Sequence, residues 1–175
     1  GVFFLALLRH FDTDLHWQYV AANQDPGMIK RLLLHPQLIP GFNDSGAHVT
    51  NMAFFDGNLR ALNIGLKDSE ACFSHMLSRL TSEPADFFGL KGVGRIEPGA
   101  RADLLLLNPE ALASYDGEAG IEYIYRDVFD CHQLVNRSPG VVAGVFVGGR
   151  RVWDGTAFEP QHNDTNLAGA LRADG

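Results

Sequence analysis

The chain has 175 residues, of which 46% are hydrophobic, and a formal net charge of −7. This length suits one ordinary domain or a part of a larger one. The acidic balance and the lack of any basic run argue against nucleic acid and anionic membranes as partners, since both select for clustered Lys and Arg.

The chain begins with an apolar run, GVFFLALL, that has no basic region before it and no small-residue cleavage site after it. The run is also too short to cross a bilayer. We therefore expect a buried segment of a protein whose beginning lies upstream, and not an export signal. The two cysteines, Cys72 and Cys131, form no close-spaced motif. Their spacing favours a reducing compartment, and hence the cytoplasm, over a disulfide framework.

A helix and then a strand are predicted before residue 43. Pro26 is expected to open the helix at its first turn, and the pair His35-Pro36 to end it. Residues 38–42 form a short apolar run bounded by turn residues, which favours a buried strand. This order of helix, strand and small-residue turn is typical of a parallel α/β unit.

Helical patterns continue from residue 53 to residue 89. An apolar face recurs over residues 53–66, and Ser69 is expected to cap the next helix. The residues expected to face inward on that helix are Ala71, Phe73, Met76, Leu77 and Leu80. A short helix is expected to begin with Ser82 as its cap and to stop at Gly89.

The pattern becomes rich in strands and turns after residue 90. Residues 102–107 are strongly apolar, and residues 141–147 are β-branched and aromatic. Gly148-Gly149 predicts a two-residue hairpin turn, after which residues 150–153 return as a strand. Residues 110–140 show only weak periodicity. We therefore place a domain boundary near residue 90, with an α/β part before it and a β-rich part with a polar tail after it.

The candidate site residues are Asp44 and His48, which follow the predicted strand. A carboxylate at a strand end can bind a metal or act as a general base, because loops at this end of an α/β unit reach the substrate. The alternative is that Asp44 only caps the turn. His48 either contacts the substrate or holds Asp44 in place, or else it is a turn histidine bonded to the backbone. The other histidines are expected to be structural.

Three segments, in this order, carry a resemblance to a known family. They are residues 43–48 (NDSGAH), residues 80–90 (LTSEPADFFGL) and residues 94–107 (GRIEPGARADLLLL). Together they resemble the C-terminal part of the amidohydrolase superfamily. The chain is most similar to the N-acyl-D-amino-acid deacylases (D-aminoacylases), in which the D-x-G-A-H turn is typical.

The resemblance implies an α/β fold in two parts. Residues 1–90 would be the C-terminal portion of a (β/α)8 metal-dependent hydrolase barrel, with its last strand and closing helices. Residues 91–175 would supply strands of a small β-sandwich. Asp44 would then be the acid at the tip of the eighth barrel strand, serving the metal site and acting as general base. Asp103 would be structural, accepting hydrogen bonds from turn amides.

The resemblance also implies a function. The activity would be metal-dependent hydrolysis of non-peptide C–N bonds, deacylating N-acyl-amino acids with Asp44 as base and His48 near the substrate. Zinc is the expected cofactor. Its other ligands are expected upstream, because the chain contains no His-x-His and zinc needs about four ligands. The chain alone is accordingly expected to be inactive, and aggregation-prone or oligomeric because of uncovered apolar faces.

Two alternatives stay open. One is a cyclic-amide hydrolase or deaminase of the same superfamily. The other is a non-catalytic relative that acts as a scaffold or binding protein.

Overall fold

A computed structural model describes residues 1–12, 15, 22–41, 52–53 and 55–160. The helices are α1 (Val2–Phe11), α2 (Pro26–Leu33), α3 (Gly57–Asp68), α4 (Glu70–Leu80), α5 (Ser82–Phe87) and α6 (Pro109–Ala113). The strands are β1 (Met52–Ala53), β2 (Leu104–Leu107), β3 (Ile121–Arg126), β4 (Cys131–Asn136), β5 (Val142–Val147) and β6 (Arg150–Trp153), with a 3₁₀ turn, η2 (Asp127–Phe129), between β3 and β4.

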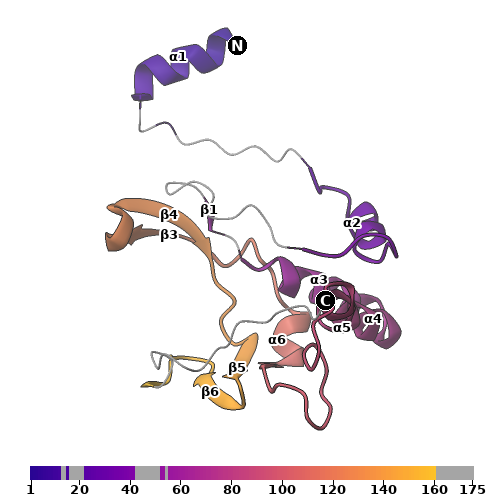
Figure 1. Cartoon of the computed structure of the whole chain (residues 1–175). Coiled ribbons are helices and arrows are strands. Elements are labelled where there is room, and N and C mark those ends of the chain that lie inside the picture. The colour runs from indigo at the N-terminus through magenta and orange to yellow at the C-terminus, as the bar shows by residue number, and fades with distance from the viewer. Residues whose placement is uncertain (13–14, 16–21, 42–51, 54, 161–175) are drawn as a thin grey trace.

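The strands form two sheets, in the orders β1-β4-β3 and β2-β5-β6. Among the described strands only the β1–β4 pair is parallel. Helices α3, α4 and α5 lie together beside these sheets (Figure 1). The described part of the chain is therefore mixed α/β, as predicted, with helices before residue 90 and most strands after it.

The predicted buried strand over residues 38–42 is wrong where the structure describes it. Residues 38–41 form no strand, and Leu38 and Ile39 are 44% and 38% exposed. A strand needs a neighbour to pair its backbone groups. Here the carbonyl of Leu38 instead accepts a hydrogen bond from the side chain of Arg79.

The prediction of a buried segment at the start of the chain is also wrong within this structure. The apolar run forms α1, whose residues are not buried; Val2 and Phe3 are 85% and 76% exposed. Figure 1 shows α1 apart from the other helices. A helix that is apolar on every side is stable when other elements bury all of its faces. Among the described residues, no element buries the faces of α1. No helix in the described ranges is long and apolar enough to cross a membrane.

Local signals place α2 as predicted. Pro26 is its first residue, and the Asp25 carboxylate accepts hydrogen bonds from the amides of Gly27 and Met28 at 2.9 and 3.2 Å. The helix ends at Leu33, before the His35-Pro36 pair. Proline at the first turn and a carboxylate cap together satisfy the free amides of a helix start.

The core lies between α3, α4 and α6. Its buried members are Ala61, Leu62, Met76, Leu112 and Val141. The predicted inward residues Phe73, Leu77 and Leu80 pack against this cluster. Ala71 is exposed, contrary to prediction, and Cys72 is buried instead. Cys72 and Met76 are four residues apart and share one helix face, which Ala71 does not.

Ser69 caps α4 as predicted, with its hydroxyl accepting a hydrogen bond from the Cys72 amide at 3.1 Å. The predicted cap of α5 is displaced by one residue. Thr81 is the N-cap there, without a side-chain cap bond, and Ser82 is the first helical residue. Gly89 ends this region as predicted, with φ of 65° in the left-handed region.

Replacing Ser69 by Ala is expected to lower the free energy of unfolding by about 1 kcal/mol, because the cap bond to the Cys72 amide is lost. Ser74 lies exposed inside the same helix. Ser74→Ala is therefore the control, and we expect it to change stability by less than about 0.5 kcal/mol. Urea denaturation measures both. Equal effects would show that Ser69 does not act as a cap.

The β5–β6 hairpin turns at Gly148-Gly149, as predicted. Both glycines have positive φ, at 56° and 80°, which is the backbone of a type I′ turn. The Asp103 carboxylate accepts a hydrogen bond from the Gly148 amide at 2.7 Å. The predicted structural role of Asp103 is thus confirmed.

Candidate functional site

The two predicted site residues, Asp44 and His48, lie outside the described residues. Their placement and roles therefore stay predictions. The described residues on either side of this segment come together at one hollow of about 280 Å³. Its lining comprises Leu33, Pro40, Gly41, Phe55, Gly57, Asn58 and Ala61. We call residues 34–41 the leading flank and residues 52–53 and 55–56 the trailing flank.

The leading flank is held by Arg79 of α4, which is only 2% exposed. Its Nε donates to the carbonyl of Leu33 at 2.5 Å, and its Nη2 donates to the carbonyls of His35, at 2.9 Å, and Leu38. Its Nη1 donates to Glu83 Oε2 at 3.0 Å. These carbonyls lie at and beyond the C-terminus of α2, where a cation is favoured by the helix dipole.

The trailing flank is held by backbone pairing. In β1, Met52 and Ala53 pair in parallel with Leu134 and Val135 of β4. β4 also pairs along its whole length with β3. The residues just before α3 are thus attached to a hairpin that lies about 80 residues further along the chain.

The buried carboxylate of Asp56 attaches the trailing flank to the rest of the chain at a second point. Asp56, which is 8% exposed, precedes α3. Its Oδ2 accepts hydrogen bonds from Arg60 Nε at 2.7 Å and from the Tyr115 hydroxyl at 2.6 Å. Arg60 Nη1 in turn contacts Glu118 Oε1 at 2.9 Å. We call Asp56, Arg60, Tyr115 and Glu118 the Asp56 cluster.

The cluster keeps Asp56 ionised. Burial alone would raise the pKa of its carboxyl, but hydrogen bonds from Tyr115 and Arg60 more than offset burial and hold the pKa below its usual range. Conversely, burial and the neighbouring carboxylate of Asp56 raise the pKa of Tyr115. Tyr115 is therefore a hydrogen-bond donor throughout the physiological pH range.

Because Gly117 has no side chain, the Asp56 cluster can occupy the space beside it. A Cβ at this position would lie 2.5 Å from both Arg60 Nη2 and Asp56 Oδ2. No side chain fits there without moving the ion pair. Glycine is therefore required at position 117 because a side chain would have no room there. The requirement does not come from a backbone conformation that only glycine adopts.

Asp56→Asn is expected to lower the free energy of unfolding at about pH 7 by about 1–3 kcal/mol, because a buried, charge-assisted network loses its charge. The pKa of Asp56 is lower in the folded chain than its ordinary value of 3.8. Its contribution is therefore full above 3.8 and is lost as pH falls through the folded value.

The stability difference between wild type and Asp56→Asn should accordingly shrink as pH falls through the pKa that Asp56 has in the folded chain. Denaturant melts across the acid range measure it. Asp86→Asn, at the exposed pair of Arg95 with Asp86, is the control and should cost less than about 1 kcal/mol at any pH. A difference that grows toward acid pH would contradict this assignment.

Within the described residues, no group of three or more His, Cys, Asp or Glu could hold a metal ion. Where described, the histidines make ordinary contacts. For example, His35 Nδ1 accepts from the Gln37 amide at 3.2 Å, and His132 stacks on Tyr123 with ring centres 4.8 Å apart. His16 and His162 lie outside the described residues.

Cys72 is not a candidate nucleophile. Cys72 is buried, and burial together with a hydrogen bond to Asp68 raises the pKa of its thiol. A thiol of raised pKa is a poor nucleophile at neutral pH. Cys72 therefore behaves as a small core residue.

Sequence reasoning missed both Arg79 and the Asp56 cluster. The spacing of Asp56 and Arg60, four residues apart at the start of a helix, was a visible signal for an ion pair. No local pattern joins Asp56 to Tyr115, or Arg79 to Leu38, since these partners are 59 and 41 residues apart.

Comparison with known proteins adds a family assignment. The sequence matches the amidohydrolase family over residues 43–152. Uncharacterized proteins of Mycobacterium tuberculosis and Mycobacterium bovis are each 34% identical to it over 167 residues. These matches cover 90% of this chain but 26% of each relative, so the chain spans about a quarter of their length. No solved structure matches the chain.

Proposed function

The chain belongs to the amidohydrolase family, and from this premise we propose that it forms part of a metal-dependent hydrolase that cuts non-peptide C–N bonds. The observation that carries the proposal is the family match, which begins at residue 43 and so includes the NDSGAH turn. Members of this family are generally metal-dependent. Zinc is the metal we propose, with ligands outside the described residues.

The substrate class we propose is N-acyl-amino acids, because the D-x-G-A-H turn is typical of the N-acyl-D-amino-acid deacylases. Water adds to the acyl carbon, the C–N bond breaks, and a carboxylate and a free amino acid leave. Asp44 takes the proton from the attacking water and gives it to the departing amine. His48 contacts the substrate.

The architecture we propose for this activity is the one that the family resemblance implies. Residues 1–90 contribute the last part of a (β/α)8 barrel, and residues 91–175 contribute strands of a β-sandwich. Such barrels carry their active sites at the C-terminal ends of the strands. Residues 38–41 form no strand in this structure, and we propose that the strand before Asp44 forms in the full-length protein, where a neighbouring strand can pair with it. We place the protein in the cytoplasm, as the cysteine usage suggests.

A panel of amides tests this function with the full-length gene product. The panel contains N-acetyl-D- and N-acetyl-L-amino acids, a dihydropyrimidine and an aminopyrimidine, and the readouts are free amino acid, ring opening and ammonia. We expect amino acid to be released from the N-acetyl compounds. Ring opening or ammonia release alone would replace the deacylase with another activity of the superfamily. A metal-loaded protein that hydrolyses none of them would contradict the proposal and favour a scaffold.

A further inference from the structure

One long side of the β3–β4 hairpin pairs with no other strand in the described part of the chain. The sheet order β1-β4-β3 puts β3 at the end of its sheet, with β4 as its neighbour. The hairpin lies at the margin of the molecule, away from α4 and α5 (Figure 1). An edge strand presents a row of backbone donors and acceptors to which a further strand can pair.

β3 also lacks several features that usually stop edge strands from pairing. Its six residues, IEYIYR, include no proline and no lysine, and its register with β4 runs without a bulge. The edge strands of the other sheet, β2 and β6, have four residues each, and register shifts interrupt their pairing with β5. Among the described sheet edges, β3 is therefore the longest regular one.

The pairing with β4 decides in which direction the backbone groups of β3 point. The register continues to Gly120 and Arg137, where the Arg137 amide donates to the Gly120 carbonyl at 2.8 Å. Hydrogen-bonded positions alternate along an antiparallel pair. The backbone groups of Glu122, Ile124 and Arg126 therefore point toward β4. Those of the residues between them point to the side away from β4.

We propose that β3 is a dimer interface, at which two copies of the protein join their β3 strands antiparallel into one continuous sheet. Backbone groups that point away from β4 must meet each other across this interface, so the possible registers differ by steps of two residues. In one of them Ile124 lies on the twofold axis, opposite the same residue of the second copy. Tyr123 then lies opposite the second copy's Tyr125. Glu122 lies opposite the second copy's Arg126.

Charge complementarity selects this register. Opposite charges directly across a strand pair stabilise it, and like charges destabilise it. A shift by two residues in either direction would place a charged residue opposite Ile124. A shift by four would place Glu122 or Arg126 opposite the same residue of the second copy. Only the register centred on Ile124 sets each of these two charges against its opposite, and twofold symmetry repeats the contact.

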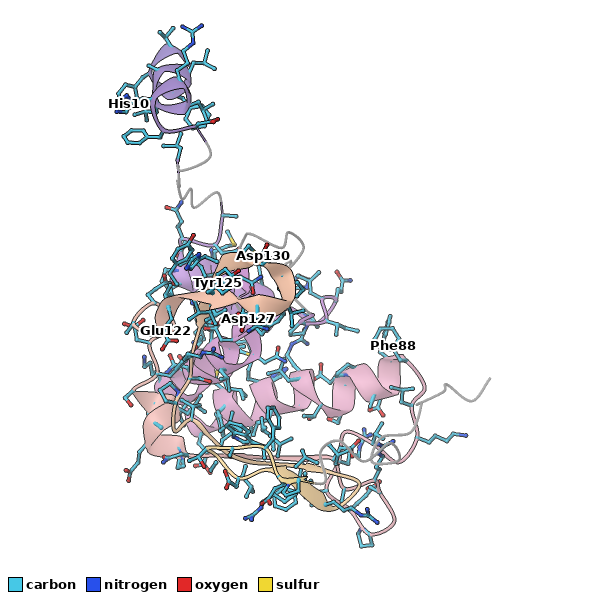
Figure 2. All side chains as sticks on the ribbon, turned by 90° about the vertical axis from the view of Figure 1, so that its left-hand side faces the viewer. His10, Phe88, Glu122, Tyr125, Asp127 and Asp130 are labelled. Atoms are coloured by element: carbon cyan, nitrogen blue, oxygen red, sulfur yellow. The ribbon has the colours of Figure 1, made fainter. Side chains whose placement is uncertain are left out.

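The tyrosine face of the hairpin supports the same register. Tyr123 and Tyr125 are 54% and 48% exposed, and alternation puts both on one face of the strand. The His132 ring lies 4.8 and 5.1 Å from their ring centres, and the Tyr125 hydroxyl donates to Asp130 (Figure 2). These contacts hold the rings in place before association. Aromatic pairs directly across two strands then add to the pairing.

Glu122 has an ionic contact within its own chain that does not prevent this pairing. Its Oε2 lies 3.6 Å from Arg137 Nε, and the two side chains are 55% and 51% exposed. An exposed pair of this kind contributes little to stability. A carboxylate also has two oxygens and can accept from two cations. The second copy's Arg126 can therefore contact Glu122 as well.

The test measures association of the full-length gene product by analytical ultracentrifugation between about 1 and 200 µM, because small interfaces form weak dimers. We expect a dimer that dissociates on dilution. Glu122→Arg and Arg126→Glu should each raise the dissociation constant about 10-fold or more, since like charges then face each other. An equimolar mixture of these two variants should associate about as tightly as wild type, because every charge again faces its opposite.

Arg150→Glu is the matched control, since Arg150 is exposed on β6, an edge strand of the other sheet. It changes the net charge as much as Arg126→Glu does. We expect it to leave the dissociation constant within about twofold of wild type, in line with surface substitutions away from an interface.

A disulfide tests the register without altering a charge. Across the proposed axis the Cα atoms at position 124 would lie about 4.5 Å apart, within the range that a disulfide spans. Ile124→Cys should therefore form a cross-linked dimer with oxidised glutathione. Ile121→Cys is the control, because its two copies would lie six residues apart along the strands, or about 20 Å, and should not cross-link.

The proposal goes beyond the proposed function and does not depend on it. A wild-type protein that stays monomeric at about 200 µM would overturn the proposal, as would happen if another segment of the full-length chain covered β3. Association that Glu122→Arg and Arg126→Glu leave unchanged, or that Arg150→Glu weakens equally, would also overturn it. A variant mixture no tighter than its components, or equal cross-linking of Ile124→Cys and Ile121→Cys, would overturn the register.

Discussion

Replacing Asp44 by Asn in the full-length gene product is expected to lower kcat for amide hydrolysis by about 10²- to 10⁴-fold, the usual range for loss of a general base. Asparagine keeps the size of the side chain but cannot accept the proton of the attacking water. The melting temperature should change little. The measurement is amino-acid release from an N-acetyl-amino acid, followed under steady-state conditions.

Asp103→Asn is the matched control for Asp44→Asn. Asp103 belongs to another segment of the family resemblance, but its carboxylate accepts a hydrogen bond from the Gly148 amide at 2.7 Å. The substitution should reduce stability by about 1 kcal/mol and leave kcat of the folded enzyme unchanged. Near-normal turnover in Asp44→Asn would refute the role of Asp44 as base.

The second large effect is expected in the core. Met76 has no exposed surface and lies among Ala61, Leu112 and Val141, which come from three further segments of the chain. Met76→Ala should lower the free energy of unfolding by about 2–5 kcal/mol, because the side chain leaves a cavity that its neighbours fill only in part. Chemical denaturation gives the value.

Met28→Ala is the control, since Met28 is 46% exposed on α2. We expect it to change stability by about 0.5 kcal/mol or less. If both methionine variants lose equal stability, the core cannot lie between α3, α4 and α6 as described.

Elements with a local chemical signal could be predicted from the sequence. Pro26 marked the start of α2, Ser69 the start of α4, and Gly148-Gly149 the β5–β6 turn. Each of these signals acts within four residues and needs no partner elsewhere in the chain. Predictions based on these local signals therefore hold regardless of how the rest of the chain packs.

Predictions that needed a distant partner were less successful. Residues 38–42 were predicted to form a buried strand, but residues 38–41 pair with no strand in the described part of the chain, and the Leu38 carbonyl bonds Arg79 instead. The β3–β4 hairpin was missed because β3 alternates imperfectly between half-buried and exposed residues. Its long antiparallel register with β4 is a pairing that no short window reveals.

The candidate site divides in the same way. Asp44 and His48 were singled out because they follow the strand predicted over residues 38–42, and the resemblance of the NDSGAH turn then suggested their roles. These roles stay predictions. Spacing carries a signal only for the Asp56–Arg60 pair, whose members are four residues apart. The bonds of Arg79 to Leu38 and of Tyr115 to Asp56 could not be found from spacing, because these partners are brought close only by folding. A buried arginine or aspartate is uncommon and demands such partners, so burial was the missing information.

Metal dependence of amide hydrolysis is the most direct test of the central claim. The full-length gene product is purified, its metal content is measured, and hydrolysis of N-acetyl-amino acids is followed before chelation, after chelation and after zinc is restored. We predict bound metal, amino-acid release that chelation abolishes, and recovery with zinc. Stoichiometric metal without hydrolysis of any amide, or hydrolysis that survives complete removal of metal, would contradict the account.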